Sequence, residues 1–292
     1  MSDNILNAMS SDLMVRVVVA DTTAAVEKAR SYHVLFPTGT ILLGRLLTAA
    51  SIMGSDLKEP DASVTLRLDG SGPVRTAIAV SDGLGWCRGC LGNRYVSLPP
   101  REDGSPNVGA AVGKGSLTVI KDINLKEPYV GRVELVSGEI AEDVTRYLYD
   151  SEQTPGVCSL GVLLNEDCSV RAAGGFILSL MPGADESVIE RVEADIAALP
   201  PMTKMLADGM TTEDIARLAL KSDFGSVTRT IPCGYRCTCS RERTEQILLS
   251  LGRKELERLA AEEDTVEVKC HFCDAVYRIS AAELLKQVDA ER

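Results

Sequence analysis

The stretch Arg236-Cys-Thr-Cys-Ser-Arg-Glu-Arg243 places two thiols one residue apart and surrounds them with cations. Two more thiols, Cys270 and Cys273, follow further along the chain with the spacing Cys-x-x-Cys. Two chelating pairs within a short segment can surround a single tetrahedral ion, and four thiolates suit zinc best. We therefore predict that Cys237, Cys239, Cys270 and Cys273 bind one Zn²⁺ per chain in the reduced state.

The same pattern fits two kinds of site. A closed zinc ribbon would only staple a small domain, whereas a reactive site would respond to oxidants. A module this small has little core, so most of its folding free energy would come from the metal, which contributes about 10–16 kcal/mol in zinc-finger peptides. Each pair is also close enough in sequence to close as a strained, reversible disulfide. Oxidation would then expel the ion and unfold the module together.

Other residues near the motifs are less suited to be metal ligands. Cys233 is expected to be a bystander, and His271, inside the Cys-x-x-Cys bite, is expected to point to solvent. His33 lies in an apolar stretch, so we predict that it is packed and not catalytic. Four cations are placed to offset the charge of the thiolates and to keep their pKa values low: Arg236, Arg241, Arg243 and Lys269.

The rest of the chain indicates an α+β fold. From Leu13 to about Leu180, β-branched runs typical of strands accompany a helical pattern at Thr40–Ser55, which favours a largely antiparallel sheet with helices. After Pro182 the period becomes helical, with one helix before Pro200 and another at about Thr211–Leu220. We predict an α+β core domain at 1–182, a helical linker at 183–230 and a small zinc-binding redox-switch domain at 231–292.

Composition narrows the classes of partner. The chain carries 31 Lys or Arg and 42 Asp or Glu, a net charge of −11, so it repels phosphate backbones and nucleic acid is a disfavoured partner. The sequence has no secretory signal pattern and no apolar run long enough for a membrane span, which predicts a cytoplasmic protein with no membrane partner. In a reducing compartment, clustered cysteines indicate metal or redox chemistry before a disulfide framework.

Longer stretches point to a family. The zinc motifs, the run Glu134-Leu-Val-Ser-Gly-Glu-Ile-Ala-Glu-Asp143 and the segment Gly174-Gly-Phe-Ile-Leu-Ser-Leu-Met-Pro-Gly-Ala-Asp185 resemble those of the redox-regulated 33-kilodalton heat-shock chaperone of bacteria. The resemblance spans nearly the whole chain. It implies a cytoplasmic holdase that works without an ATP cycle and is not an enzyme.

The resemblance also implies a mechanism. Zinc on the four cysteines keeps the protein inactive, and oxidants such as hypochlorite, or peroxide with heat, form the disulfides Cys237–Cys239 and Cys270–Cys273. Zinc then leaves, the C-terminal domain unfolds and the helical middle region loosens. The oxidised protein, as a homodimer, holds unfolding client proteins, and the core domain takes part in binding them.

A second Cys-x-x-Cys departs from the family pattern. Cys87 and Cys90 follow Trp86, which is similar to a thioredoxin active site, where the first thiol lies at a helix N-terminus. A thiol-disulfide oxidoreductase using Cys87 and Cys90 is therefore the alternative function. The glycines around them favour turns between strands instead, in which both thiols would be inert.

Overall fold

The computed structural model describes residues 2–290 and divides into two compact units, one ending at Arg236 and the other beginning at Cys237. The first unit combines two sheets with helices, and the second contains a two-stranded sheet with further helices. The predicted α+β class is confirmed. The predicted three-part division of the chain stays a prediction. Between residues 2 and 290, no helix is both long and apolar enough to cross a membrane.

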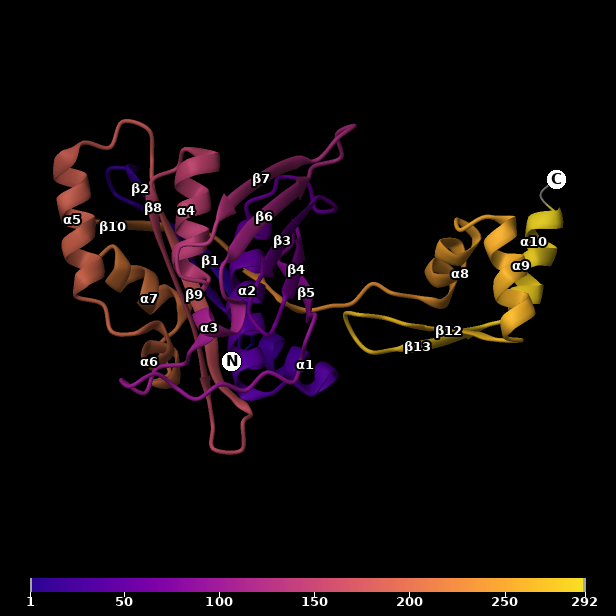
Figure 1. Ribbon diagram of the computed structural model, residues 1–292. Helices are drawn as coiled ribbons and strands as arrows, with labels where there is room; N and C mark the ends of the chain where they lie inside the picture. Colours follow the sequence, from indigo (N-terminus) through magenta and orange to yellow (C-terminus); the bar gives the residue numbers. More distant parts are fainter. Residues whose placement is uncertain (1, 291–292) are drawn as a thin grey trace. The chain divides into compact units, whose positions relative to one another are not determined.

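Two sheets form the framework of the first unit (Figure 1). The first sheet is antiparallel throughout and contains, in spatial order, β10 (Phe224–Pro232), β1 (Asn4–Ser10), β2 (Val15–Asp21), β9 (Val170–Leu180) and β8 (Gly156–Leu164). The second sheet contains, in spatial order, β11 (Gly234–Tyr235), β5 (Trp86–Leu91), β4 (Thr76–Asp82), β3 (Ser63–Gly70), β6 (Gly115–Asp122) and β7 (Tyr129–Glu134). Its strands are antiparallel except for β11, which runs parallel to β5.

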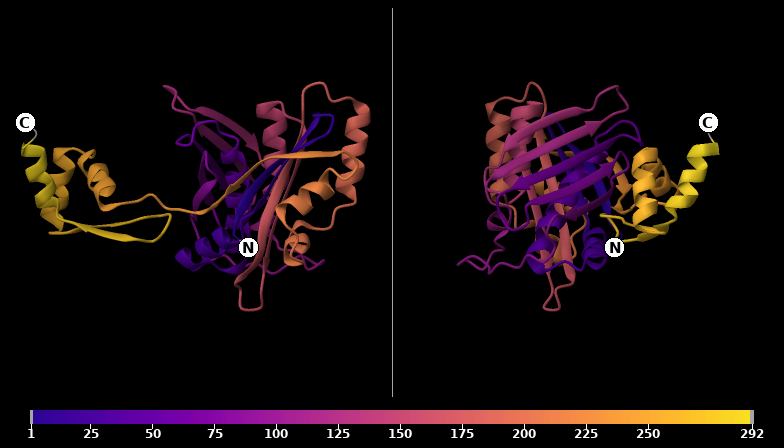
Figure 2. Two further views of the ribbon diagram at one scale, coloured as in Figure 1. Left: turned by 180° about the vertical axis from the view of Figure 1, so that it is seen from behind. Right: turned by 45° about the vertical axis from the view of Figure 1, so that its right-hand side comes forward.

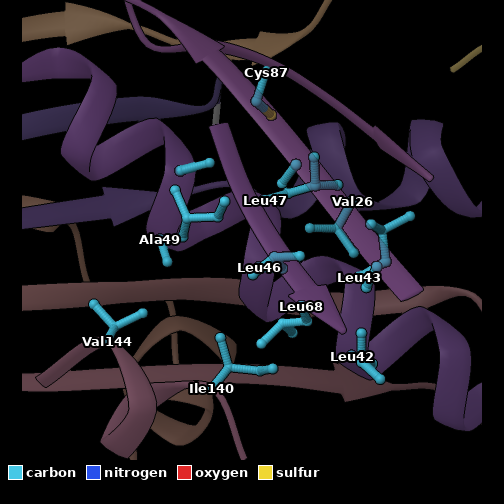
Figure 3. Close-up of a cluster of buried hydrophobic side chains, with 14 of the residues drawn as sticks. Val26, Leu42, Leu43, Leu46, Leu47, Ala49, Leu68, Cys87, Ile140 and Val144 are labelled. Carbon is cyan, nitrogen blue, oxygen red and sulfur yellow. The ribbon is translucent and has the colours of Figure 1, made fainter. Parts of the chain in front are cut away.

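Helix α2 (Pro37–Ser55) lies between the two sheets, where it contacts β4 and β5 on one side and β8 and β9 on the other. Nearly every residue of the helix is buried, as expected for a helix enclosed by two layers. At Gly44 an added Cβ would lie 2.7 Å from side-chain atoms of Val26 and Val162, so only glycine allows this close approach. Four of its side chains are fully buried in the core shown in Figure 3: Leu42, Leu43, Leu46 and Leu47.

The other helices of the first unit are α1 (Thr23–His33), α3 (Val108–Val112), α4 (Ala141–Glu152), α5 (Glu186–Ala197), α6 (Met202–Ala207) and α7 (Thr212–Ala219). Helices α5, α6 and α7 cover the face of the five-stranded sheet that is turned away from α2 (Figures 1 and 2). Met202 and Met205 are buried there and fill the second apolar cluster of the unit.

Two of these helices were expected from the sequence. Helix α7 matches the helix predicted at about Thr211–Leu220 and begins with a capping box, in which the Thr211 hydroxyl accepts a hydrogen bond from the Asp214 N–H (3.1 Å) and the Asp214 carboxylate accepts one from the Thr211 N–H (2.9 Å). Helix α5 matches the predicted amphipathic segment. Helix α6 was not predicted, because a six-residue helix is too short to show a period.

The segment that follows α7 returns to the core before the second unit begins. Strand β10 pairs with β1 along its length, and β11 then pairs with β5. The Tyr235 hydroxyl donates to the carbonyl oxygen of Gly89 (3.1 Å), and the Arg236 N–H donates to the carbonyl oxygen of Cys87 (2.8 Å). Arg236 also forms an ion pair with Asp82 (2.6 Å). The chain is therefore anchored to both sheets immediately before Cys237.

The run Glu134–Asp143 encloses a buried carboxylate. The Asp143 side chain is fully buried, and Ile140, also fully buried, has a φ of 76°, a conformation that β-branched residues rarely adopt. Four backbone N–H groups donate to the Asp143 carboxylate at 2.8–3.3 Å, those of Val136, Ser137, Gly138 and Ile140. The carboxylate thus holds the turn between β7 and α4 in its strained conformation.

The second unit contains α8 (Arg241–Leu249), α9 (Arg253–Glu262), β12 (Val266–Lys269), β13 (Val276–Ile279) and α10 (Ala281–Ala290). The apolar cluster of this unit is small, with Leu248, Leu256, Ile279 and Leu284 buried at its centre. A core of this size contributes little stability, which agrees with the expectation that the module needs another source of folding free energy.

Candidate metal centre

A β-hairpin positions Cys270 and Cys273. Strands β12 and β13 pair antiparallel, and Cys270 directly follows β12. The connecting turn is closed by the Cys270 N–H donating to the Ala275 carbonyl oxygen (2.8 Å) and by the Asp274 N–H donating to the Cys270 carbonyl oxygen (3.0 Å). Asp274 has a φ of 60°, the left-handed conformation that aspartate tolerates in tight turns. The turn brings both thiols of the Cys-x-x-Cys motif to the end of the hairpin.

The start of α8 positions Cys237 and Cys239. Ser240 is the N-cap, and its hydroxyl accepts a hydrogen bond from the Arg243 N–H (3.2 Å). The two cysteines precede this cap, separated by the exposed Thr238. A helix that begins at a fixed residue therefore sets the place of the Cys-x-Cys motif.

The two motifs meet. The four sulfur atoms all lie within 4.8 Å of one another. The Sγ atoms of Cys237 and Cys270 are 3.6 Å apart, and those of Cys239 and Cys273 are 3.4 Å apart. A tetrahedral zinc ion with bonds of about 2.3 Å places its sulfur ligands about 3.8 Å apart. The cluster therefore has the ligand type, number and spacing that fit a zinc ion.

The electrostatics of the cluster also fit a cation. Burial raises the pKa values of Cys237 and Cys273. Burial acts in the same direction on Cys239, but hydrogen bonds from the Tyr277 hydroxyl and the neighbouring cysteines outweigh it and lower the pKa of Cys239. Four thiolates this close repel one another, so all four can ionise together only around a positive charge.

Three of the four predicted cations pair with carboxylates. Lys269 pairs with Asp274 (3.1 Å) and Arg241 with Glu245 (2.9 Å). Arg236 pairs with Asp82 in the first unit, as described above, and its guanidinium stacks on the Trp86 ring, 5.1 Å from the centroid. Arg243 is exposed. Three of the four are thus shared with carboxylates, and the expectation that the four residues offset the charge of the thiolates stays a prediction.

Sequence reasoning missed the polar group that reaches a ligand. The Tyr277 hydroxyl donates a hydrogen bond to the Cys239 sulfur at 3.1 Å. Tyr277 lies on β13, opposite Val268 of β12. The alternation in Val276-Tyr-Arg-Ile279 is a strand signal that would have placed its side chain on one face of the hairpin.

The remaining thiols lie outside the cluster. All nine cysteines are free, and Cys233 is buried in the first unit, where burial raises its pKa. It is a bystander, as predicted. His271 is exposed and His33 is buried, with its Nε2 3.0 Å from the Gly89 carbonyl oxygen, so both histidines also match their predictions.

The second Cys-x-x-Cys motif lies within strand β5 and not at a turn or a helix N-terminus. Cys87 faces the core and is fully buried, whereas Cys90, three residues on, faces the opposite side of the strand. Residues so spaced along a strand are about 10 Å apart, too far for a disulfide. Burial also raises the pKa of Cys87 to about 12, which leaves it unreactive. This geometry gives no support to a thiol-disulfide oxidoreductase.

Comparison with known proteins gives consistent matches along the whole chain. Residues 3–280 match the family model described as Hsp33 protein. The 33 kDa chaperonin of Acetivibrio thermocellus is 43% identical over 288 residues, which cover 99% of this chain and 97% of that protein. The 33 kDa chaperonin of Clostridioides difficile is 44% identical over 287 residues, which cover 98% of both. The crystal structure of the 33 kDa chaperonin (heat shock protein 33 homolog) of Thermotoga maritima superposes with a TM-score of 0.91 at 36% identity, covering 99% of this chain and 100% of that one.

Proposed function

Because the chain belongs to the Hsp33 family, and thus has a chaperone function, we propose that it is a redox-regulated, ATP-independent holdase of the cytoplasm. In the reduced state Cys237, Cys239, Cys270 and Cys273 bind zinc and the protein is inactive. Oxidation to two disulfides activates it, and the active homodimer binds unfolding proteins. The observation that carries this proposal is the cluster of four thiols drawn from two separate motifs.

Zinc, when bound, supplies a crosslink between the two motifs and a positive charge that stabilises four thiolates. Disulfides within the motifs, Cys237–Cys239 and Cys270–Cys273, would each join residues of one motif and leave the two motifs unconnected. Formation of each disulfide removes two electrons from two thiolates. Hypochlorous acid accepts those two electrons and one proton and leaves chloride and water, so the step balances with hypochlorous acid as the only oxidant.

Disulfides between the motifs would have the opposite effect. The sulfur atoms of Cys237 and Cys270 are 3.6 Å apart and those of Cys239 and Cys273 are 3.4 Å apart, and bonds there would keep the motifs crosslinked. Only pairing within the motifs removes the crosslink and lets the module unfold. We therefore expect peptide mapping of the oxidised protein to find disulfides within each motif.

A groove on the first unit is suited to hold apolar client segments. It has a volume of about 680 Å³ and is formed by α4, α5 and strands β8 and β9. Three exposed large side chains line it, Val136, Tyr149 and Ile189, with 60%, 61% and 38% of their surface accessible. Three charged side chains also line it, Glu142, Glu193 and Arg146, of which Arg146 pairs with Asp150. Exposed apolar surface of this kind marks an interaction site, and the acidic side chains favour apolar segments flanked by basic residues.

Replacing Tyr149 with serine should weaken client binding by about tenfold, since burial of an aromatic side chain contributes about 1.5–3 kcal/mol. The measurement is anisotropy of a fluorescent peptide of leucine and valine flanked by lysine, titrated with oxidised protein. Tyr129→Ser is the matched control, because Tyr129 is also 61% exposed but lies on β7 away from the groove. Equal affinities for the two variants would exclude the groove.

The holdase activity is tested by light scattering of heat-denatured citrate synthase. We expect protein oxidised with hypochlorite to suppress aggregation at about stoichiometric amounts and the reduced, zinc-bound protein to leave it unchanged. Re-reduction in the presence of zinc should remove the protection. Aggregation that proceeds equally with reduced and oxidised protein would refute redox regulation.

A further inference from the structure

The Tyr277 hydroxyl connects the two halves of the metal centre. Tyr277 belongs to the hairpin that carries Cys270 and Cys273, yet its hydroxyl donates to the sulfur of Cys239, a residue of the other motif, at 3.1 Å. The contact therefore spans the same two segments that the four-thiol cluster joins. A second contact between them, from the Arg241 guanidinium to the Arg278 carbonyl oxygen (3.0 Å), holds the start of α8 against β13.

A hydrogen bond to a ligand sulfur has a stronger effect than one between neutral groups. A thiolate is a charged acceptor, and charge-assisted hydrogen bonds are shorter and stronger than neutral ones. Groups that donate to metal ligands fix the orientation of the ligand and tune the metal, and their loss typically costs 10- to 100-fold in metal affinity. The hydroxyl of Tyr277 is placed for this role, since it donates to the Cys239 sulfur at 3.1 Å, whereas Lys269 and Arg241 pair with carboxylates.

We propose that Tyr277 is a positioning residue that holds Cys239 in the ligand set and thereby sets the zinc affinity of the switch. The inference rests on the proposed function and adds a residue outside the four cysteines that determines zinc affinity. When Cys239 enters a disulfide, its sulfur loses its negative charge and becomes a weak acceptor. The hairpin then loses its hydrogen bond to the Cys-x-Cys motif in the same event that removes the metal ligands.

The test compares Tyr277→Phe with the wild-type full-length chain in the reduced state. Phenylalanine keeps the ring and removes only the hydroxyl. Zinc affinity is measured by competition with a chromogenic chelator, and we expect about tenfold weaker binding in the variant. With Co²⁺ as a spectroscopic probe, the sulfur-to-cobalt charge-transfer band should move to lower energy, because a thiolate without the hydrogen bond is the better electron donor.

The matched control is Thr244→Val. This change also removes one hydroxyl from the second unit. Thr244 is buried, and its hydroxyl donates to the Ser240 carbonyl oxygen (2.8 Å), not to a sulfur. We expect this variant to keep the wild-type zinc affinity and cobalt spectrum. Equal affinities for Tyr277→Phe and wild type, or equal losses in Tyr277→Phe and Thr244→Val, would overturn the inference alone. A wild-type chain that binds no zinc would overturn the proposed function as well.

Discussion

Replacing Cys270 with serine is expected to abolish zinc binding and to unfold the second unit. A serine hydroxyl does not supply the thiolate that the site requires, and three remaining ligands leave the ion exposed to water. Structural zinc contributes about 10–16 kcal/mol in zinc-finger peptides, far more than the small apolar cluster of this unit can replace. The measurements are zinc content per chain and amide hydrogen exchange of residues 237–290.

The first unit should stay folded in this variant, because it has two apolar clusters of its own and ends in the anchored strands β10 and β11. Cys168→Ser is the control, since Cys168 is a partly buried thiol in the hairpin between β8 and β9 and lies outside the cluster. It should bind one zinc and keep full protection. A Cys270→Ser protein with wild-type zinc content and exchange would show that the four thiols are not the ligand set.

Replacing Asp143 with alanine is expected to lower the free energy of unfolding of the first unit by about 4 kcal/mol or more. The change leaves the four backbone N–H groups around the carboxylate without an acceptor, and each buried unsatisfied donor costs about 1–3 kcal/mol. The turn would also lose the group that holds Ile140 at its positive φ. Thermal unfolding followed by circular dichroism should show a fall in Tm of about 10 °C.

Asp150→Ala is the matched control for this prediction. Asp150 lies on the same helix, α4, but it is exposed and pairs with the exposed Arg146. Exposed ion pairs of this kind contribute about 0.3–0.5 kcal/mol, so the control should unfold within about 2 °C of wild type. Equal Tm values for the two variants would mean that the Asp143 carboxylate does not stabilise the turn. Zinc content should not change in either variant, since the ligands lie in the other unit.

The grouping of the four cysteines was predictable because ligand spacing is a local signal. Two residues at Cys-x-Cys or Cys-x-x-Cys spacing are close together in space whatever the fold, so only the proximity of the two motifs had to be inferred. The other contacts around the four cysteines depend on residues that are distant in sequence or on the fold of the hairpin, so local spacing does not reveal them. Arg236 is adjacent to Cys237 in sequence, yet it pairs with Asp82 in the first unit. Tyr277 reaches Cys239 only because an unpredicted strand turns the chain back.

The fold was predictable where periodicity is strong and not where it depends on distant pairing. Helix α2 and strand β2 follow directly from their apolar patterns. The glycines around Cys87 and Cys90 predict turns, but Gly89 lies within strand β5, where an added Cβ would be 2.6 Å from the Ile78 carbonyl oxygen and 3.0 Å from the Leu43 side chain. Strands β10 and β11 pair with β1 and β5, and no sequence period reveals partners so far away in the chain.

The central claim is that the second unit cannot stay folded once its sulfur atoms bond to each other within the motifs. The most direct test is hydrogen exchange measured by mass spectrometry on one sample during stepwise oxidation with hypochlorite, with zinc release and disulfide pairs followed in parallel. We predict that residues 237–290 lose protection in proportion to the zinc released, while strands β1, β2 and β9 stay protected. Oxidised protein that has formed Cys237–Cys239 and Cys270–Cys273 and released its zinc, yet keeps the second unit protected, would contradict the claim.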